Sequence, residues 1–178
     1  EKHDLRETPK AFVGYSDLTS VLAYLTTVCG IVSFHGPMLD RRLGCGTDAY
    51  DRDSFLEALT STEPLGEIAA PSLEVFCKGE AAGPMLGGTL AQLVASLGTP
   101  YAFKPPRGHV LFLEDVAERP YRLDRMLTQL RLAGILDSAS AVVLGEFLDC
   151  DEPGGEPSAR AVLADLLAQA RAPRRSRE

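Results

Sequence analysis

The chain has 178 residues, a hydrophobic content of 45%, and 18 basic against 25 acidic residues, for a net charge of −7. This length allows one domain or two small ones with a buried core, and the composition is that of an ordinary globular protein. The acidic balance argues against nucleic acid and anionic membranes as partners, and no apolar run approaches the roughly 20 residues of a membrane helix.

The first 60 residues predict a β-α-β unit. We expect a strand at 11–13, a helix at 17–28 that Gly30 ends, and a second strand at 31–34 followed by a turn containing His35. This order favours parallel strands joined by a crossover helix. A loop at 39–53 and a short helix at 53–60, capped by Asp53 or Ser54, complete this part.

The remaining residues predict a second α/β unit, joined to the first near residues 61–72. The stretch 79–88 is rich in glycine and small residues, and residues 83–90 are interpreted as a tight turn where the backbone approaches a ligand or another strand. We expect strands at 73–77, 110–113 and 141–144, and helices at 90–97, 120–133 and 159–170. An acidic loop at 151–157 and a basic tail at 171–178 complete the chain.

The four cysteines are far apart and form no C-x-x-C pair. A zinc site is therefore not expected, and neither is any other metal or cofactor. A reduced, cytoplasmic compartment is the simplest interpretation, although spacing alone leaves disulfide pairing open. The first residues are charged and do not include a methionine, so we see no signal peptide and expect a fragment.

Ser16 is the first candidate for chemistry. It follows an apolar strand and Gly14 in the sequence FVGYSDLT, residues 12–19. A serine at such a strand-to-helix corner stands beside the N–H groups that begin the helix, which can stabilise an oxyanion. This is the geometry of a nucleophile elbow, written G-x-S-D. The alternative is that Ser16 or Asp17 only caps the helix.

Glu114 is the second candidate, because it follows the buried strand expected at 110–113. The carboxyl ends of such strands gather catalytic groups in α/β folds, and a carboxylate there could orient a histidine. The alternatives are a solvated strand end, Asp115 capping a downstream turn, or a surface charge network that involves Glu118, Arg119, Arg122, Asp124 and Arg125.

None of the three histidines is a convincing general base. His3 lies in a polar terminal segment. His109 precedes Glu114 by five positions, an odd offset that directs the two side chains to opposite faces of one strand. His35 is the local candidate for Ser16, and a turn histidine bonded to backbone is the alternative.

Several sequence strings, taken together and in order, resemble the LD-carboxypeptidases, a serine peptidase family that includes the microcin C immunity peptidases. The resemblance covers roughly residues 8–150. Its strings are PKAFVGYSDLT (9–19), HGPM (35–38), LGGTL (86–90), LGTPY (97–101), LFLEDV (111–116), PYRLDRML (120–127), AGIL (133–136) and VLGEF (143–147).

The resemblance implies a cytoplasmic enzyme of cell-wall recycling that removes the terminal D-alanine from a murein tetrapeptide with a Ser-Glu-His triad. By motif, Ser16 matches the nucleophile, Glu114 the acid, and the Asp17 N–H an oxyanion donor. It also implies an α/β fold class, with the remnant of an N-terminal α/β sheet domain (1–60), a linker (61–72), an incomplete and mostly β C-terminal α+β domain (73–170) and a tail (171–178).

Two family landmarks are absent from the sequence. An earlier R-G-G-Y-G string is missing, and no histidine follows Phe147, where a G-H string near the C-terminus of family members provides the catalytic histidine. We therefore expect a fragment lacking both ends, with little or no activity alone, because a serine without its base is a poor nucleophile. The alternatives are a non-catalytic truncated paralogue, a muropeptide-binding module, or an immunity-type peptidase acting on peptidyl-nucleotides. A homodimer is left open.

Overall fold

The computed structural model describes residues 5, 7–8, 10–39, 42–68 and 72–171. The chain divides into two compact units, Glu1–Gly79 and Glu80–Glu178, and each is described by itself below. The linker expected at 61–72 lies before this boundary, and the domain limits given by the sequence stay predictions.

The first unit contains the expected β-α-β arrangement. Strand β1 (Val13–Gly14) pairs in parallel with β2 (Phe34–His35). Between them run a 3-10 turn (Ser16–Leu18), helix α2 (Thr19–Tyr24) and a π turn (Leu25–Cys29). Both strands lie later than the apolar runs that predicted them, because strands form where the two segments pair. His35 is therefore a strand residue and not a turn residue.

Gly30 ends the α2 segment as predicted, in a left-handed conformation with a φ of 68°. A small core forms where the helical segment returns to the sheet. Leu25, Cys29 and Ile31 are buried there, with Phe12 and Tyr24 packed against them.

Helix α3 (Arg52–Thr60) confirms the short helix expected at 53–60, but its cap was predicted wrongly. Asp51 is the N-cap, and its Oδ1 accepts from the Ser54 N–H at 2.9 Å. The strand expected at 73–77 is also wrong. No strand is present there in the described part of the chain, and Leu73 and Val75 are exposed.

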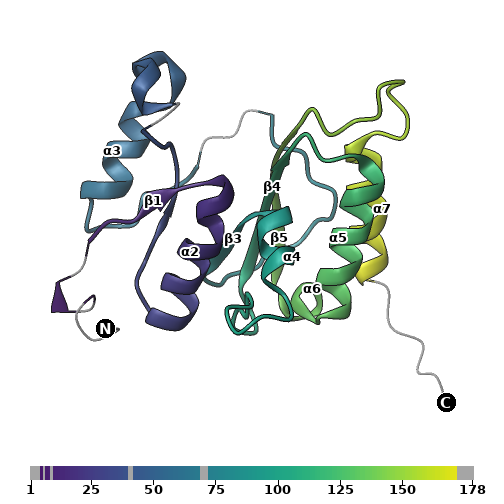
Figure 1. Ribbon diagram of the computed structural model, residues 1–178, viewed down its shortest axis with the longest axis horizontal. Helices are drawn as coiled ribbons and strands as arrows, with labels where there is room; N and C mark the ends of the chain where they lie inside the picture. The colour runs from purple at the N-terminus through teal and green to yellow at the C-terminus, as the bar shows by residue number, and fades with distance from the viewer. Residues whose placement is uncertain (1–4, 6, 9, 40–41, 69–71, 172–178) are drawn as a thin grey trace. The chain divides into compact units, whose positions relative to one another are not determined.

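The second unit is a parallel sheet of β3 (Met85–Thr89), β4 (Val110–Val116) and β5 (Ala141–Leu148), in that order. Helices α4 (Leu90–Ser96), α5 (Pro120–Leu132), α6 (Ile135–Ser138) and α7 (Ala159–Arg171) lie on one side of it (Figure 1). The predicted α/β class is confirmed. Within the described residues this unit is more helical than β, unlike the mostly β domain expected.

The glycine-rich stretch interpreted as a turn contains strand β3. Its Gly87 has a φ of 152°, and a Cβ there would lie 1.8 Å from the carbonyl oxygen of Phe112 on β4. The prediction that the backbone approaches another strand here is therefore confirmed, but the segment is a strand and not a tight turn. Glycine allows this approach because it has no side chain.

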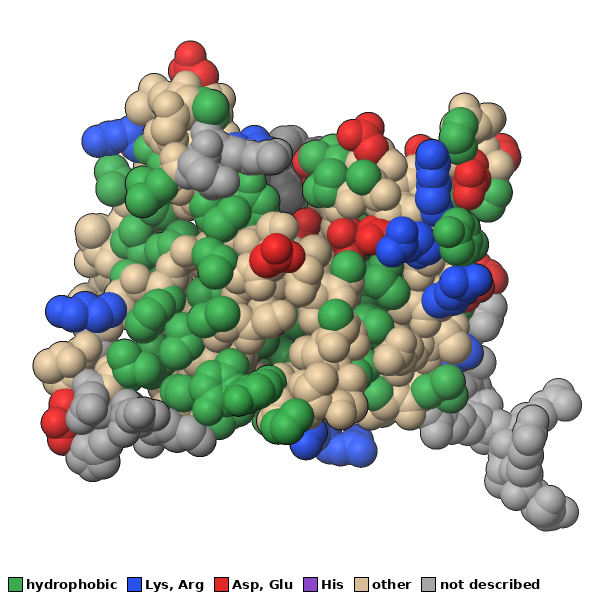
Figure 2. Space-filling view, viewed as in Figure 1, with side chains coloured by type: hydrophobic (Ala, Val, Ile, Leu, Met, Phe, Trp, Pro, Cys, Tyr) green, Lys and Arg blue, Asp and Glu red, His purple; other side chains and the backbone are tan. Residues whose placement is uncertain are grey.

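The core of the second unit lies between β4 and the helices. Leu111 and Leu113 alternate along β4 and are fully buried, as are Leu123 and Leu130 of α5. In contrast to this apolar core, the surface over the α5 region carries basic side chains mixed with acidic ones (Figure 2). None of the described helices combines the length and apolar character that a membrane crossing requires.

Candidate functional site

Ser16 occupies a strained backbone position at the corner between β1 and α2. Tyr15 is extended, with a φ of −150°, and Ser16 then adopts a φ of 57°. This left-handed conformation is uncommon for a residue with a side chain and occurs at functional sites. Ser16 is also exposed. An exposed serine in a strained strand-to-helix turn is the geometry of a nucleophile elbow.

Gly14 makes this corner tight. A Cβ on Gly14 would lie 2.5 Å from Cδ1 of Leu18, one turn later. Gly14, the glycine of the G-x-S-D string, therefore permits a close approach between the strand and the helical turn that follows it.

The helical turn begins at Ser16 itself, so Ser16 is not the N-cap. Tyr15 is the N-cap and makes no side-chain cap bond, while the Leu18 N–H donates to the Tyr15 carbonyl at 3.2 Å. The Asp17 N–H thus belongs to the first turn, where backbone N–H groups carry partial positive charge. The alternative in which Ser16 caps the helix is wrong.

His35 lies on β2 and pairs in register with Gly14 on β1. Its ring packs edge-on against Tyr15, with centroids 6.5 Å apart. Desolvation lowers the pKa of His35, which favours the neutral imidazole.

His109 is fully buried at the start of β4. Its Nδ1 lies 2.9 Å from the Pro106 carbonyl oxygen, and its Nε2 has no hydrogen-bond partner among the described residues. Desolvation lowers the pKa of His109, and the bond to Pro106 partly opposes this. These contacts are those of a core histidine. His3 lies outside the described residues.

Glu114 lies near the carboxyl end of β4, directly opposite Thr89 of β3. The Thr89 hydroxyl donates to Oε1 of Glu114. On the β5 side the ladder shifts register between Leu113 and Asp115, and a Cβ on Gly145 would lie 3.1 Å from the Glu114 Cβ. Glu114 therefore has a hydroxyl donor on one neighbouring strand and space left by a glycine on the other.

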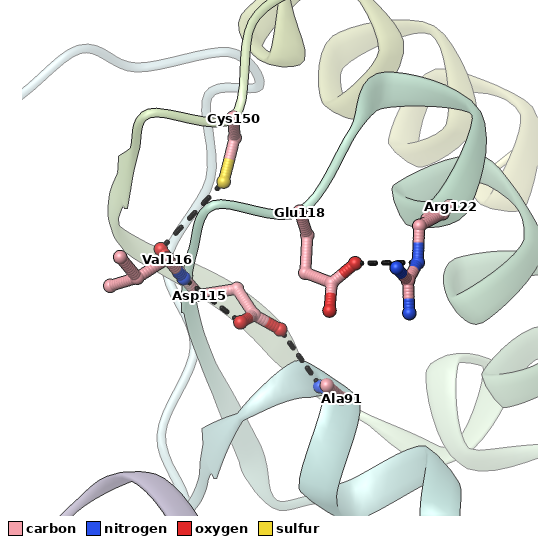
Figure 3. A network of polar contacts seen from close by, with 6 residues as sticks. All are labelled: Ala91, Asp115, Val116, Glu118, Arg122 and Cys150. Atoms are coloured by element: carbon pink, nitrogen blue, oxygen red, sulfur yellow. Dashed lines mark hydrogen bonds and ion pairs between the residues drawn. The ribbon is translucent and has the colours of Figure 1, made fainter.

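Asp115 is buried, with 4% of its surface exposed. Its Oδ2 accepts from the Ala91 N–H and its Oδ1 from the Val116 N–H, each at 2.9 Å (Figure 3). Desolvation raises the pKa of Asp115, while these two bonds oppose the rise. The prediction that Asp115 caps a downstream turn is wrong, since it caps α4, which precedes it in the sequence.

The charged residues after β4 form separate contacts instead of one network. Arg122 pairs with Glu118 at 2.7 Å (Figure 3), and the Arg125 guanidinium lies 5.1 Å from the centre of the Tyr121 ring. Arg119 donates to the backbone carbonyl of Asp151 at 3.1 Å. These contacts hold the start of α5 and are partly exposed, so each contributes little stability.

The predicted site residues fall in both units, with Ser16 and Asp17 in the first and Glu114 in the second. Sequence reasoning missed the hydroxyl of Thr89 and the space at Gly145. Both belong to strings that carry the family resemblance, and assigning β3 as a strand would have placed Thr89 opposite Glu114. The described residues contain no group of three or more metal-binding side chains.

Comparison with known proteins places this geometry in a family. Residues 82–175 match the model of the LD-carboxypeptidase C-terminal domain, and residues 2–36 match that of the LD-carboxypeptidase N-terminal domain. A Bacillus subtilis protein named "Probable murein peptide carboxypeptidase" is 38% identical over 152 residues, which are 82% of this chain and 46% of that protein. The chain thus spans about half the length of the curated relatives it matches.

Solved structures agree with these matches. A muramoyltetrapeptide carboxypeptidase from Oxalobacter formigenes is 31% identical, with a TM-score of 0.73 over 95% of this chain and 58% of that one. The wild-type microcin C7 self immunity protein MccF is 25% identical, with a TM-score of 0.77 over 94% and 58%. With both domain models matched and a relative 38% identical over 82% of its length, the chain belongs to the LD-carboxypeptidase family.

Proposed function

We propose that this chain carries the nucleophile and the acid of a serine-type carboxypeptidase that removes the terminal D-alanine from murein tetrapeptide in the cytoplasm. Ser16 is the nucleophile, Glu114 orients the catalytic base, and the Asp17 N–H is one donor of the oxyanion hole. The observation that carries the proposal is the strained, exposed conformation of Ser16 in a G-x-S-D turn.

The three assigned roles define the reaction. Attack of the Ser16 hydroxyl on the scissile carbonyl places negative charge on the carbonyl oxygen, which N–H groups at the helix start stabilise. A base must accept the hydroxyl proton and return it to the leaving amine of D-alanine. Glu114 serves the base by fixing its orientation and stabilising its cation, the role of the acid in a triad.

The base itself has no matching residue in these 178 residues. His109 is buried and holds the Pro106 carbonyl, and His35 packs on Tyr15. His109 follows Gly108, but neither histidine lies after Phe147, where the family's G-H string near the C-terminus would be. We propose that the 178-residue polypeptide alone turns over substrate slowly or not at all, because the serine hydroxyl is not activated.

The experiment measures D-alanine released from murein tetrapeptide by the 178-residue polypeptide and by Ser16→Ala. We expect no more than slow release, abolished by Ser16→Ala. Fast turnover that disappears in Ser16→Ala would keep the nucleophile and overturn the proposed inactivity. Fast turnover that persists in Ser16→Ala would reject Ser16 as the nucleophile.

A second candidate is hydrolysis of peptidyl- or aminoacyl-nucleotides. The fold similarity to MccF favours it, since the TM-score of 0.77 is at least as high as the 0.73 of the murein enzyme. The higher identity to murein carboxypeptidases, 38% and 31% against 25%, supports the murein substrate. Calorimetric binding of murein tetrapeptide and of aspartyl sulfamoyl adenosine to Ser16→Ala distinguishes the two.

A further inference from the structure

Two neighbouring residues of β4 are bound to the same short segment of chain from opposite faces of the sheet. Glu114 and Asp115 alternate along the strand, so their side chains point to opposite faces. Glu114 accepts from Thr89, which is the last residue of β3 and the N-cap of α4. Asp115 accepts from Ala91, the second residue of α4.

We propose that Asp115 is a positioning residue for Glu114. It fixes the end of β4 against the first turn of α4, and thereby keeps Thr89 within hydrogen-bond reach of the Glu114 carboxylate. This inference rests on the proposed function, in which Glu114 orients the catalytic base. We call the pair of bonds, Thr89 to Glu114 and Ala91 to Asp115, the β4–α4 clamp.

The clamp acts at the one irregular point in the pairing of β4 with β5, because the ladder resumes after it at Asp115–Phe147 and Val116–Leu148. The register of the β4–β5 ladder shifts between Leu113 and Asp115, and Glu114 lies within that shift. Gly145 leaves space beside the Glu114 Cβ. Within the shift the β5 ladder does not fix the orientation of Glu114, so the bonds from Thr89 and, through Asp115, from Ala91 set it from the α4 side.

A carboxylate suits this position better than its amide. Each Asp115 oxygen accepts one backbone N–H, from Ala91 and from Val116. An asparagine has only one oxygen and would direct its NH₂ group at one of these donors. Ionised Asp115 at the N-terminus of α4 also meets the positive end of the helix, which offsets part of the cost of its burial.

The test is a nuclear magnetic resonance measurement on the labelled 178-residue polypeptide, and it needs no catalytic activity. The readouts are the exchange rate of the Thr89 hydroxyl proton and the Overhauser contacts between the Thr89 and Glu114 side chains. In Asp115→Asn we expect hydroxyl exchange to rise about tenfold, the scale of one lost hydrogen bond, and those contacts to disappear.

Asp151→Ala is the control for a general loss of stability. Asp151 Oδ1 accepts from the Ala159 N–H at 2.7 Å, so alanine removes a cap bond at the start of α7. We expect it to lower stability without changing Thr89 hydroxyl exchange. Loss of the Thr89–Glu114 contact in Asp151→Ala as well would overturn the inference, because the contact would then report only general loosening.

A second variant reaches the clamp from α4. Ala91→Pro deletes the N–H that Asp115 accepts and keeps the carboxylate, and proline is tolerated in the first turn of a helix. The Thr89–Glu114 contact should weaken as in Asp115→Asn. Its persistence in either folded variant would show that Asp115 only caps α4 and would overturn the inference.

The unmodified polypeptide provides a test even if neither variant folds. The Ala91 amide and the Thr89 hydroxyl should exchange through one opening event, with equal dependence on low concentrations of denaturant. A Thr89 hydroxyl that exchanges freely while the Ala91 amide stays protected would overturn the clamp. D-alanine release that persists in Ser16→Ala would instead count against the proposed function and leave these readouts unaffected.

Discussion

Ser16 and Glu114 are held in place by different kinds of interaction. At Ser16 the constraint lies in the backbone, where a φ of 57° is imposed between a two-residue strand and a helical turn. At Glu114 it lies in hydrogen bonds, from Thr89 directly and, as we propose, from Ala91 through Asp115. A nucleophile must be exposed, and the strained turn leaves the Ser16 side chain exposed. An acid that orients a base must keep a fixed direction, and hydrogen bonds provide that.

The difference predicts how each site fails. Sterically demanding substitutions should disturb the Ser16 corner, and loss of single hydrogen bonds should disturb the Glu114 side chain. The strand pair β3–β4, which positions Thr89 opposite Glu114, should be sensitive to both kinds of change. Its backbones approach closely at Gly87, so added bulk there would also disturb the hydrogen bond to Glu114.

The largest effect is expected at Gly87. An alanine Cβ would lie 1.8 Å from the Phe112 carbonyl oxygen, and backbone cannot move aside as a side chain can. We expect Gly87→Ala to cost about 4 kcal/mol or more, or to prevent folding of the second unit. Gly154→Ala, where nothing lies within 4 Å, should change stability by no more than about 0.5 kcal/mol in denaturant unfolding. Similar effects of the two substitutions would contradict the close approach.

Gly14→Ala tests the steric half of the comparison. The new Cβ would meet the Leu18 side chain at 2.5 Å, and we expect a loss of about 1–3 kcal/mol from overpacking. Leu18→Ala in the same chain removes the 2.5 Å contact with Cδ1 and leaves only the Leu18 Cβ at 3.0 Å, so the double variant should recover part of that loss. Hydrogen exchange of α2 amides measures the effect within the first unit. Purely additive losses would show that Gly14 is not limited by Leu18.

Sequence reasoning located the helices better than the strands. Proline at the start of α5 and glycine after α2 and α5 are local signals, and the helices began and ended where they indicated. Strand β3 was mistaken for a turn because its glycine permits a close approach to β4, and the pairing of these two distant segments is not visible in the sequence. The apolar residues at 73–77 predicted a strand wrongly, since alternation alone does not supply a pairing partner.

The site shows the same division between local and distant information. The elbow was predictable, because Gly14, Ser16 and the helix that follows are adjacent in sequence. The role of Asp115 was not, because its partner Ala91 lies 24 positions earlier on another element. Thr89 was missed for the same reason, at a separation of 25.

A smaller effect is expected at Ser16 itself. Replacing Ser16 by glycine relieves the positive φ, whereas alanine removes the hydroxyl and keeps the strain. We expect Ser16→Gly to be more stable than Ser16→Ala by about 1 kcal/mol, the order of the penalty for a left-handed residue with a side chain. Equal stability of the two variants in thermal unfolding would indicate that the corner is not strained.

The smallest expected effect is a dependence of stability on pH. Desolvation lowers the pKa of His109 and of His35, so the folded state binds their protons less readily than the unfolded state. Their stabilising contribution is complete above the unfolded pKa of about 6.5 and is lost as pH falls through the lower folded values. His109→Asn should flatten this slope in denaturant midpoints measured from pH 8 to 5. An unchanged slope would contradict the role assigned to the buried ring.

The most direct test of the central claim supplies the base that the sequence does not. Imidazole added to the 178-residue polypeptide should accelerate D-alanine release from murein tetrapeptide, by about tenfold or more if it accepts the Ser16 proton. The acceleration should disappear in Ser16→Ala and fall in Glu114→Gln. An equal acceleration in Ser16→Ala, or none in a polypeptide shown by calorimetry to bind the tetrapeptide, would contradict the account.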